Sequence, residues 1–218
     1  FDNARRDVSA ALVQAGFQPQ NIRQFSVRPE RYKDTNPEKS ELRGIYGALV
    51  DLSGRTQSGC VFYMTSHGAP QGAQLDQGLM RPGVLADMLD RTCGKRPTVV
   101  VISACFSGVF VPALAQPNRM VLTAARPDRT SFGCGQDIKY PYFDDCFLSS
   151  MPGAHDFGGL ASAVRECVRA REVAENLTPP SEPQFWVGAQ LRPMLPLYAF
   201  DWTASTTKAA DSAGSRQR

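Results

Sequence analysis

The stretch that decides the fold is TVVVISA, at residues 98–104. This unbroken apolar run is rich in β-branched side chains, which predicts a strand buried on both faces, as in a parallel sheet. A second apolar run, CVFYMT at Cys60–Thr65, predicts another buried strand. Between the two runs, apolar side chains at helical spacing predict a helix around residues 84–89. A strand, a helix and a strand in this order predict a right-handed βαβ crossover in a parallel sheet.

The same alternation continues along the rest of the chain. Apolar side chains at helical spacing predict helices at residues 4–16, from Pro37 to about residue 52, and at residues 160–168. Apolar runs predict strands at residues 22–27, 120–124 and 185–189. Polar or glycine-rich stretches predict exposed loops at residues 28–38 and 66–81. The alternation predicts an α/β fold with a mainly parallel sheet, whose functional site lies beyond the carboxyl ends of the strands.

The composition is that of one folded domain. The chain has 218 residues, of which 42% are hydrophobic and 21% charged, and residues 1–202 are predicted to form a single domain. Residues 203–218 contain no large apolar side chain and predict a disordered tail. The net charge is only +3, and the scattered basic residues argue against a nucleic-acid partner. No apolar run approaches the roughly 18–20 residues of a membrane-spanning helix, so membrane association is expected only through a segment upstream of Phe1.

The six cysteines are too few for a disulfide scaffold in a chain of this length. No CxxC pair exists, which argues against a zinc ribbon or a thioredoxin-like motif, and we expect no metal and no cofactor. Cys134 and Cys146 flank an acidic loop that contains Asp144 and Asp145. The sequence leaves open whether these two cysteines form a disulfide or remain separate, half-buried thiols.

Two chemically active side chains follow the two central strands. His67 comes after the strand CVFYMT, and Cys105 comes after the strand TVVVISA. Because adjacent parallel strands lie about 4.8 Å apart, we expect the two side chains to meet above the edge of the sheet. A cysteine beside a histidine suits nucleophilic catalysis, with backbone N–H groups of Gly68 and Cys105 to hold an oxyanion. The alternative is that Cys105 only packs in the core, as most cysteines at strand ends do.

Three stretches around these strands carry a further pattern. They are VFYMTSHG at residues 61–68, ISACFSG at residues 102–108, and LTAARP at residues 122–127 continuing to SFGC at residues 131–134. Together they resemble the caspase-like cysteine peptidases of clan CD, and within that clan the legumain family. The resemblance covers about residues 4–150 and is similar in form to bacterial members. It implies a three-layer caspase-like domain in which helices flank the central sheet.

The resemblance also implies roles for individual residues. His67 and Cys105 match the catalytic dyad of the family, and Gly68 matches a backbone donor to the oxyanion. The asparagine that orients the histidine in the family has a candidate in Asn3. These correspondences imply that Cys105 attacks the peptide carbonyl and that His67 protonates the leaving amine.

The specificity pocket of the family takes Asn, and it maps onto four residues of this chain. They are Ser103, Thr130, Ser131 and Asp145. Legumains have Glu where Ser103 stands, so a pocket that keeps Asp145 without that Glu is also compatible with a basic residue.

These features predict a cysteine endopeptidase of the legumain type, which cleaves peptide or protein substrates after Asn through a thioester intermediate. Two alternatives stay open: a transamidase or peptide ligase that uses the same dyad, and a non-enzymatic caspase-like binding module. The bacterial form of the resemblance implies a periplasmic or membrane-tethered protein. The sequence does not indicate an oligomeric state.

Overall fold

The central sheet contains four strands in the order β3, β7, β8, β9. The computed structural model describes residues 1–135 and 137–202, and the predicted tail at residues 203–218 lies outside them. The strands are β3 (Cys60–Thr65), β7 (Thr98–Ser103), β8 (Arg119–Thr123) and β9 (Gln184–Val187). β3, β7 and β8 pair in parallel, and β9 runs antiparallel to β8. The predicted α/β fold with a mainly parallel sheet is therefore confirmed.

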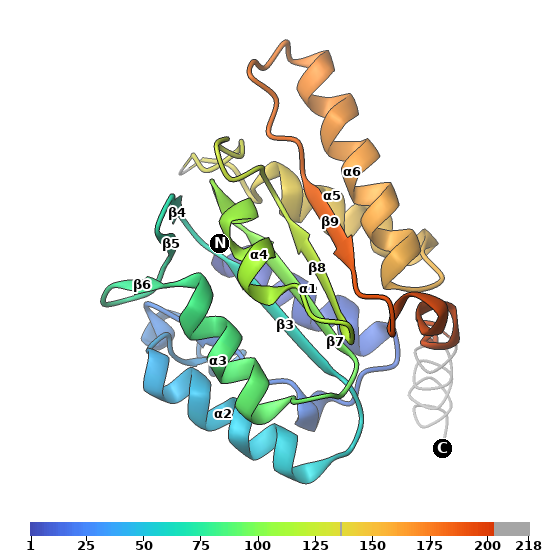
Figure 1. The fold of residues 1–218 in the computed structure, drawn as a ribbon. Coiled ribbons are helices and arrows are strands. Elements are labelled where there is room, and N and C mark those ends of the chain that lie inside the picture. Colours follow the sequence, from blue (N-terminus) through green and yellow to red (C-terminus); the bar gives the residue numbers. More distant parts are fainter. Residues whose placement is uncertain (136, 203–218) are drawn as a thin grey trace, which may run out of the picture.

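Helices cover both faces of the sheet and complete three layers (Figure 1). One face carries α1 (Asp2–Gln14), α5 (Tyr142–Ser150) and α6 (Phe157–Ala174). The other face carries α2 (Leu42–Arg55), α3 (Pro82–Thr92) and α4 (Val111–Leu114). Short 3-10 helices occur at Pro19–Asn21, Pro29–Arg31, Ser107–Phe110, Met151–Gly153 and Arg192–Leu197.

Strand β7 places its side chains alternately in two hydrophobic clusters. Val99 and Val101 pack into the cluster with α1, α5 and α6, whereas Val100 and Ile102 pack into the cluster with α2, α3 and α4. A strand has this period of two because successive side chains point to opposite faces. None of the four is more than 7% exposed, which explains why the run TVVVISA is apolar throughout.

The N-terminal third of the chain differs from its prediction. Within the predicted strand at residues 22–27, only β1 (Phe25–Ser26) forms a strand, and it pairs with β2 (Glu38–Lys39) instead of with the central sheet. Helix α2 begins at Leu42 and not at Pro37, because the residues that follow Pro37 form β2.

The predicted loop at residues 66–81 also contains regular structure. Three short antiparallel strands form a separate sheet: β4 (Gly68–Ala69), β5 (Gly72–Gln74) and β6 (Leu79–Met80). Ala73 and Met80 are fully buried in the cluster with α2 and α3, so this segment packs on the core instead of extending into solvent.

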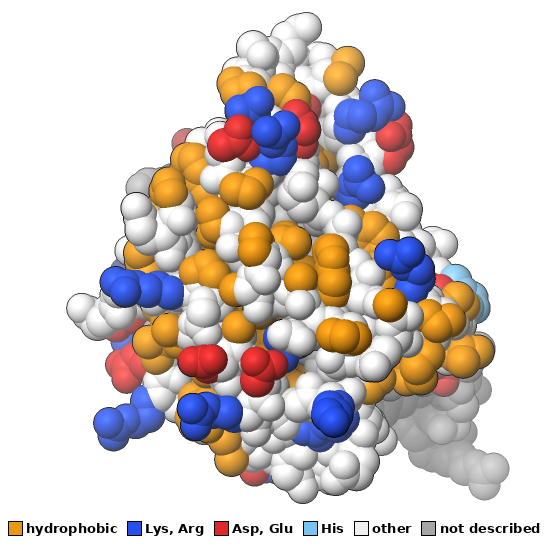
Figure 2. Space-filling view, in the orientation of Figure 1, with side chains coloured by type: hydrophobic (Ala, Val, Ile, Leu, Met, Phe, Trp, Pro, Cys, Tyr) orange, Lys and Arg blue, Asp and Glu red, His pale blue; other side chains and the backbone are white. Residues whose placement is uncertain are grey.

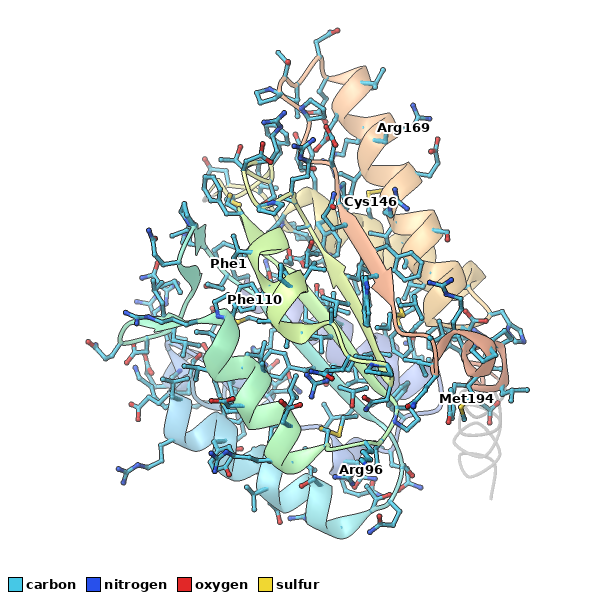
Figure 3. The ribbon with its side chains drawn as sticks, in the orientation of Figure 1. Phe1, Arg96, Phe110, Cys146, Arg169 and Met194 are labelled. Atoms are coloured by element: carbon cyan, nitrogen blue, oxygen red, sulfur yellow. A yellow bond between two sulfur atoms is a disulfide. The ribbon has the colours of Figure 1, made fainter. Side chains whose placement is uncertain are left out.

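Two disulfides tie helices to their neighbours. Cys60–Cys93 joins β3 to the end of α3, and Cys146–Cys167 joins α5 to α6 (Figure 3). Of the two alternatives left open for Cys134 and Cys146, the disulfide does not form, because Cys146 is buried where α5 packs against α6 and meets Cys167 there. Cys105 and Cys134 are free thiols.

A cavity of about 1360 Å³ lies beside β3, lined by residues of α1, β1, α2 and β3. Strand β3 is at the edge of the four-stranded sheet, and five of its six side chains are only partly buried. His67 and Cys134 also line this cavity. The cavity therefore reaches the carboxyl end of β3, where the sequence predicts the functional site.

Charges of both signs are mixed on the molecular face shown in Figure 2. Exposed ion pairs of the protein include Arg126 with Asp128 and Arg169 with Glu166. Across residues 1–135 and 137–202, no helix is both long and apolar enough to cross a membrane.

Candidate active site

The predicted histidine and cysteine follow neighbouring strands at matching positions. Thr65, the last residue of β3, is the register partner of Ser103, the last residue of β7. The Ser66 N–H donates to the carbonyl of Ser103 at 3.0 Å, which extends the ladder one step beyond the strands. His67 and Cys105 each stand two residues beyond these partners. Parallel pairing therefore brings both residues to the same edge of the sheet.

Gly68 contacts the backbone of Cys105 more closely than any other residue type allows. A Cβ atom at Gly68 would lie 1.9 Å from the carbonyl oxygen of Cys105 and 2.9 Å from its nitrogen. On the opposite side, the Gln74 N–H donates to the carbonyl of His67 at 2.8 Å, so β5 fixes the backbone of the histidine. The His67 ring is exposed, and the Phe1 ring packs edge-on against it with centroids 4.8 Å apart.

The Cys105 thiol is held by a loop that follows β8. The Ser131 N–H donates to the Cys105 Sγ at 3.3 Å, and the Ser131 hydroxyl oxygen lies 3.5 Å from that sulfur. Phe106 has a φ of +57°, in the left-handed region that a bulky residue rarely occupies. Its N–H donates to the carbonyl of Arg129 at 2.7 Å. This bond holds the turn after Cys105 against the loop, and the backbone strain lies next to the candidate nucleophile.

The surroundings of Cys105 favour its thiolate. The hydrogen bond from the Cys134 thiol is the largest cause, and with Ser131 and the positive charge of His67 it lowers the pKa of Cys105 to about 5, while burial opposes the shift. The same pairing raises the pKa of Cys134 well above that of an ordinary thiol. Because the thiolate is the reactive form of cysteine, the lowered pKa favours Cys105 over Cys134 as the candidate nucleophile.

A buried carboxyl group lies beneath the strand ends. Asp144 accepts hydrogen bonds from the hydroxyl groups of Thr65, at 2.6 Å, and of Tyr63. Ser103 also hydrogen bonds to it, but burial outweighs these bonds and raises the pKa of Asp144 to about 6. The sequence predicts a solvated acidic loop here, whereas the structure contains α5 with Asp144 on its buried side. The spacing of Phe143, Cys146 and Phe147 is the signal for this helix.

The four predicted pocket residues lie in different surroundings. Ser103 is buried next to Asp144, whereas Thr130 is exposed and Ser131 contacts the Cys105 sulfur. Asp145 lies on α5 and pairs with Arg171 of α6, with 2.8 Å between Oδ2 and Nη1. The structure therefore brings Ser131 to the Cys105 sulfur and buries Ser103 two residues before Cys105, while Asp145 is bound by an arginine.

Two further side chains bear on the predicted site. The side-chain amide of Asn3 donates to the carbonyl of Lys139 at 3.2 Å, so the candidate for orienting His67 is engaged elsewhere. Cys134 is the residue that the sequence did not assign to the site. The sequence feature that could have pointed to Cys134 is its position at the end of the SFGC stretch, which belongs to the family resemblance. Among the described residues, no group of three or more His, Cys, Asp and Glu side chains is placed to hold a metal ion.

The fold and the placement of a cysteine and a histidine at adjacent strand ends define a caspase-like protein. Caspase-1 from Spodoptera frugiperda is similar in structure, with a TM-score of 0.59 and 14% sequence identity over 85% of this chain and 77% of that chain. Residues 39–162 match the Peptidase C13 family, and the chain belongs to this family. No curated protein matches the sequence. The chain is thus a cysteine peptidase of the legumain and caspase kind, in agreement with the resemblance.

Proposed function

We propose that this protein is an endopeptidase that cleaves after Asn, with Cys105 as nucleophile and His67 as acid and base. One observation carries the proposal: the Cys105 sulfur, held by the Ser131 N–H at 3.3 Å, lies at the carboxyl end of β7 beside the His67–Gly68 segment. This is the edge at which open α/β sheets bind their ligands.

The proposed reaction has two halves. The Cys105 thiolate attacks the carbonyl carbon of the scissile peptide bond, and the N–H groups of Gly68 and Cys105 stabilise the oxyanion. His67 protonates the leaving amine, which leaves a thioester on Cys105. His67 then removes a proton from water, the hydroxide attacks the thioester, and the acid product leaves with the Cys105 thiolate and the protonated His67 restored.

The proposed preference for Asn follows from the charges at the pocket. Ser103, Thr130, Ser131 and Asp145 are the residues we assign to it, as the family resemblance implies. Arg171 lies 2.8 Å from Asp145 and already balances its charge. A neutral amide side chain can donate to this carboxylate and accept from a hydroxyl, whereas a basic side chain would meet the charge of Arg171. The pair therefore favours Asn over Lys or Arg.

The test is cleavage of a peptide mixture that varies at the residue before the cut, read by mass spectrometry. Cuts after Asn that disappear in Cys105→Ala are the expected result. Cys105→Ala removes one small, half-buried side chain, so its thermal unfolding should match that of the parent. Cuts after other residues would overturn the pocket, and cuts that persist in Cys105→Ala would overturn the dyad.

The same experiment separates the alternatives. An added amine that appears in a ligated product would identify a transamidase or ligase, because the amine then competes with water for the thioester. A binding module would leave the mixture intact and its Cys105 unreactive toward a thiol-directed inhibitor.

We propose an oxidising location for the protein, such as the periplasm or the outer side of a membrane in a bacterium. The disulfides Cys60–Cys93 and Cys146–Cys167 support this location, because disulfides persist in oxidising compartments and are rare in the cytosol. Peptide mapping of the protein from its native source, without reductant, tests it. Reduced thiols at these four positions would contradict the proposal.

A further inference from the structure

We propose that Glu172 is a positioning residue for the candidate active site, on which it acts through Ser181 and the loop after β8. Glu172 lies near the end of α6 and is 3% exposed, and Ser181, in the segment before β9, is 1% exposed. The C-terminal end of α6 lies at the same end of the sheet as the carboxyl end of β8 (Figure 1). Because carboxylates are almost never buried unless they are paired, the groups that bind this one indicate what it holds in place.

The Glu172 carboxylate binds both the backbone and the side chain of Ser181. The Ser181 N–H donates to Oε1 at 3.1 Å and to Oε2 at 3.3 Å, and the Ser181 hydroxyl donates to Oε1. Hydrogen bonds to a charged acceptor are stronger than those between neutral groups, and loss of the carboxylate would leave a buried N–H without its partner. These bonds fix Ser181 relative to α6, and they leave its carbonyl for a second contact.

That carbonyl holds the loop after β8. It accepts from the Arg126 N–H at 2.9 Å, and the Arg126 carbonyl accepts from the Arg129 N–H at 3.3 Å, which closes a tight turn. On its other side, this turn packs against the 3-10 helix that follows β7. A Cβ atom at Gly108 of that helix would lie 2.5 Å from the nitrogen of Pro127. The turn is therefore enclosed between Ser181 and the segment that follows the candidate nucleophile.

Two contacts join the end of this turn to the segment of Cys105. The Arg129 carbonyl accepts from the Phe106 N–H at 2.7 Å, and the Ser131 N–H donates to the Cys105 Sγ at 3.3 Å. Phe106 has a φ of +57°, and backbone strain of this kind persists only where the surrounding structure holds it. The path of contacts from Glu172 therefore ends at the strained residue beside the sulfur and at the N–H group that binds the sulfur.

Loss of the Glu172 carboxylate should displace the sulfur although it removes no group that reacts. Once the segment before β9 is released, the loop after β8 can move. Cys134 and Ser131, which both belong to this loop, and the charge of His67 lower the pKa of Cys105. A displaced loop should therefore raise this pKa. The effect on the thiol does not depend on the proposed function, whereas an effect on peptide cleavage rests on it.

The experiment compares Glu172→Ala with Glu172→Gln, whose amide oxygen can still accept from the Ser181 N–H. Iodoacetamide alkylation of Cys105 is followed as a function of pH by peptide mapping, and kcat is measured with Asn peptides. In Glu172→Ala we expect the alkylation midpoint to move to higher pH. We also expect kcat to fall by up to about 100-fold, because misplacement of a reacting group by about 1 Å lowers the rate by this factor. Glu172→Gln should remain close to the parent in both measurements.

The matched control is Asp156→Ala, which removes a carboxylate from the opposite end of the same helix. Asp156 is the N-cap of α6 and accepts from the N–H groups of Gly158 and Gly159 at 2.8 and 2.9 Å. Its loss should lower the midpoint of thermal unfolding, because an N-cap stabilises its helix. The alkylation midpoint and kcat should stay at the values of the parent. All variants are measured well below their unfolding midpoints, so that loss of folded protein does not contribute.

An unchanged alkylation midpoint and kcat in Glu172→Ala would overturn the proposal, as would equal changes in Asp156→Ala. If Glu172→Ala does not fold, Glu172→Asp takes its place, because its shorter side chain keeps the charge but withdraws the carboxylate from Ser181. The same shift is then expected, and an unchanged midpoint would again overturn the proposal. A shifted midpoint in a protein that cleaves no peptide would retain the positioning role and reject the peptidase. Equal cleavage by the parent and Glu172→Ala would retain the peptidase and reject the positioning role.

Discussion

Gly68 lies so close to Cys105 that a Cβ atom on it would come within 1.9 Å of the Cys105 carbonyl oxygen. The segments after β3 and β7 thus meet through their backbones, with no space for a side chain between them. This contact ties the position of His67, one residue before Gly68, to the position of the thiol. A close backbone approach of this kind is available only to glycine.

Gly68→Ala tests this contact. We expect the added methyl group to push the two segments apart. The expected loss in kcat/KM is about 100-fold, because a misplacement of reacting groups by about 1 Å lowers the rate by this factor. The overpacking should also reduce the free energy of unfolding by about 1–3 kcal/mol. Peptide cleavage and urea unfolding measure the two effects.

The matched control for that variant is Gly47→Ala on α2, where nothing lies within 4 Å of the added atom. Its activity should not change, and its stability should rise by up to about 1 kcal/mol, because alanine is the better helix former. A fully active Gly68→Ala protein would show that the backbone contact does not position the dyad.

The pH dependence of Cys105 alkylation should report the hydrogen bond from Cys134. In the parent protein the rate should rise with a midpoint at about pH 5, because the pKa of Cys105 is lowered to about 5. Cys134→Ala removes the largest cause of this shift, so its midpoint should move to higher pH. Cys134→Ser retains a hydroxyl donor and should fall between the two. A midpoint that does not move in Cys134→Ala would exclude the thiol pair as the cause.

Asp144 should make the protein less stable as the pH rises. Burial raises the pKa of this carboxyl from 3.8 to about 6, so between these values the folded chain keeps a proton that the unfolded chain has lost. The free energy of unfolding therefore falls with increasing pH across this window, by about 1.4 kcal/mol for each unit of the pKa difference.

Asp144→Asn supplies the comparison, because its side chain stays neutral at all pH values. The stability of the parent minus that of the variant should decrease from pH 4 to pH 6 and then level off in urea titrations. A difference that is independent of pH would show that the Asp144 carboxyl titrates normally.

Asp145→Ala should alter substrate preference more than stability. Loss of a hydrogen bond from substrate to a charged group costs about 1.5–3 kcal/mol, so kcat/KM for Asn peptides should fall roughly 10- to 100-fold. The ion pair with Arg171 is partly exposed, and its loss should cost no more than about 1 kcal/mol of stability.

Glu175→Ala is the control for Asp145, because Glu175 also pairs with Arg171, at 3.2 Å, but was not assigned to the pocket. Its preference for the residue before the cut should be that of the parent. An unchanged preference in Asp145→Ala would remove Asp145 from the proposed specificity pocket, and Ser103 and Ser131 would remain assigned to it.

Much of the scaffold could be predicted because it depends on local pattern. The run at residues 98–104 indicates a strand buried on both sides, and β7 has all six residues buried. Once β3 and β7 are parallel neighbours, the residues after each strand must meet at one edge of the sheet. The proximity of His67 and Cys105 could therefore be predicted from their positions directly after the two strands. Parallel pairing through a right-handed crossover leaves few alternatives.

The pairs that decide the chemistry of the site were not predictable in this way. Asp144 and Asp145 are neighbours in the chain, yet the first is fully buried and the second pairs with Arg171, because α5 turns them by about 100° about its axis. Cys146 likewise meets Cys167 because both helices present these side chains to each other. Burial and disulfide pairing of these residues depend on which face of each helix packs against the rest of the protein. A short stretch of sequence does not contain that information.

The sequence by itself determined the four strands of the central sheet and the two residue types that stand at its edge, because each follows from a local run and the residues after it. The tertiary structure alone decided that Ser131 contacts the Cys105 sulfur, that Asp144 lies beneath the end of β3, and that Gly68 contacts the Cys105 backbone. These contacts join segments that are distant in the chain. Their formation depends on packing of the whole core, so only the folded protein contains them.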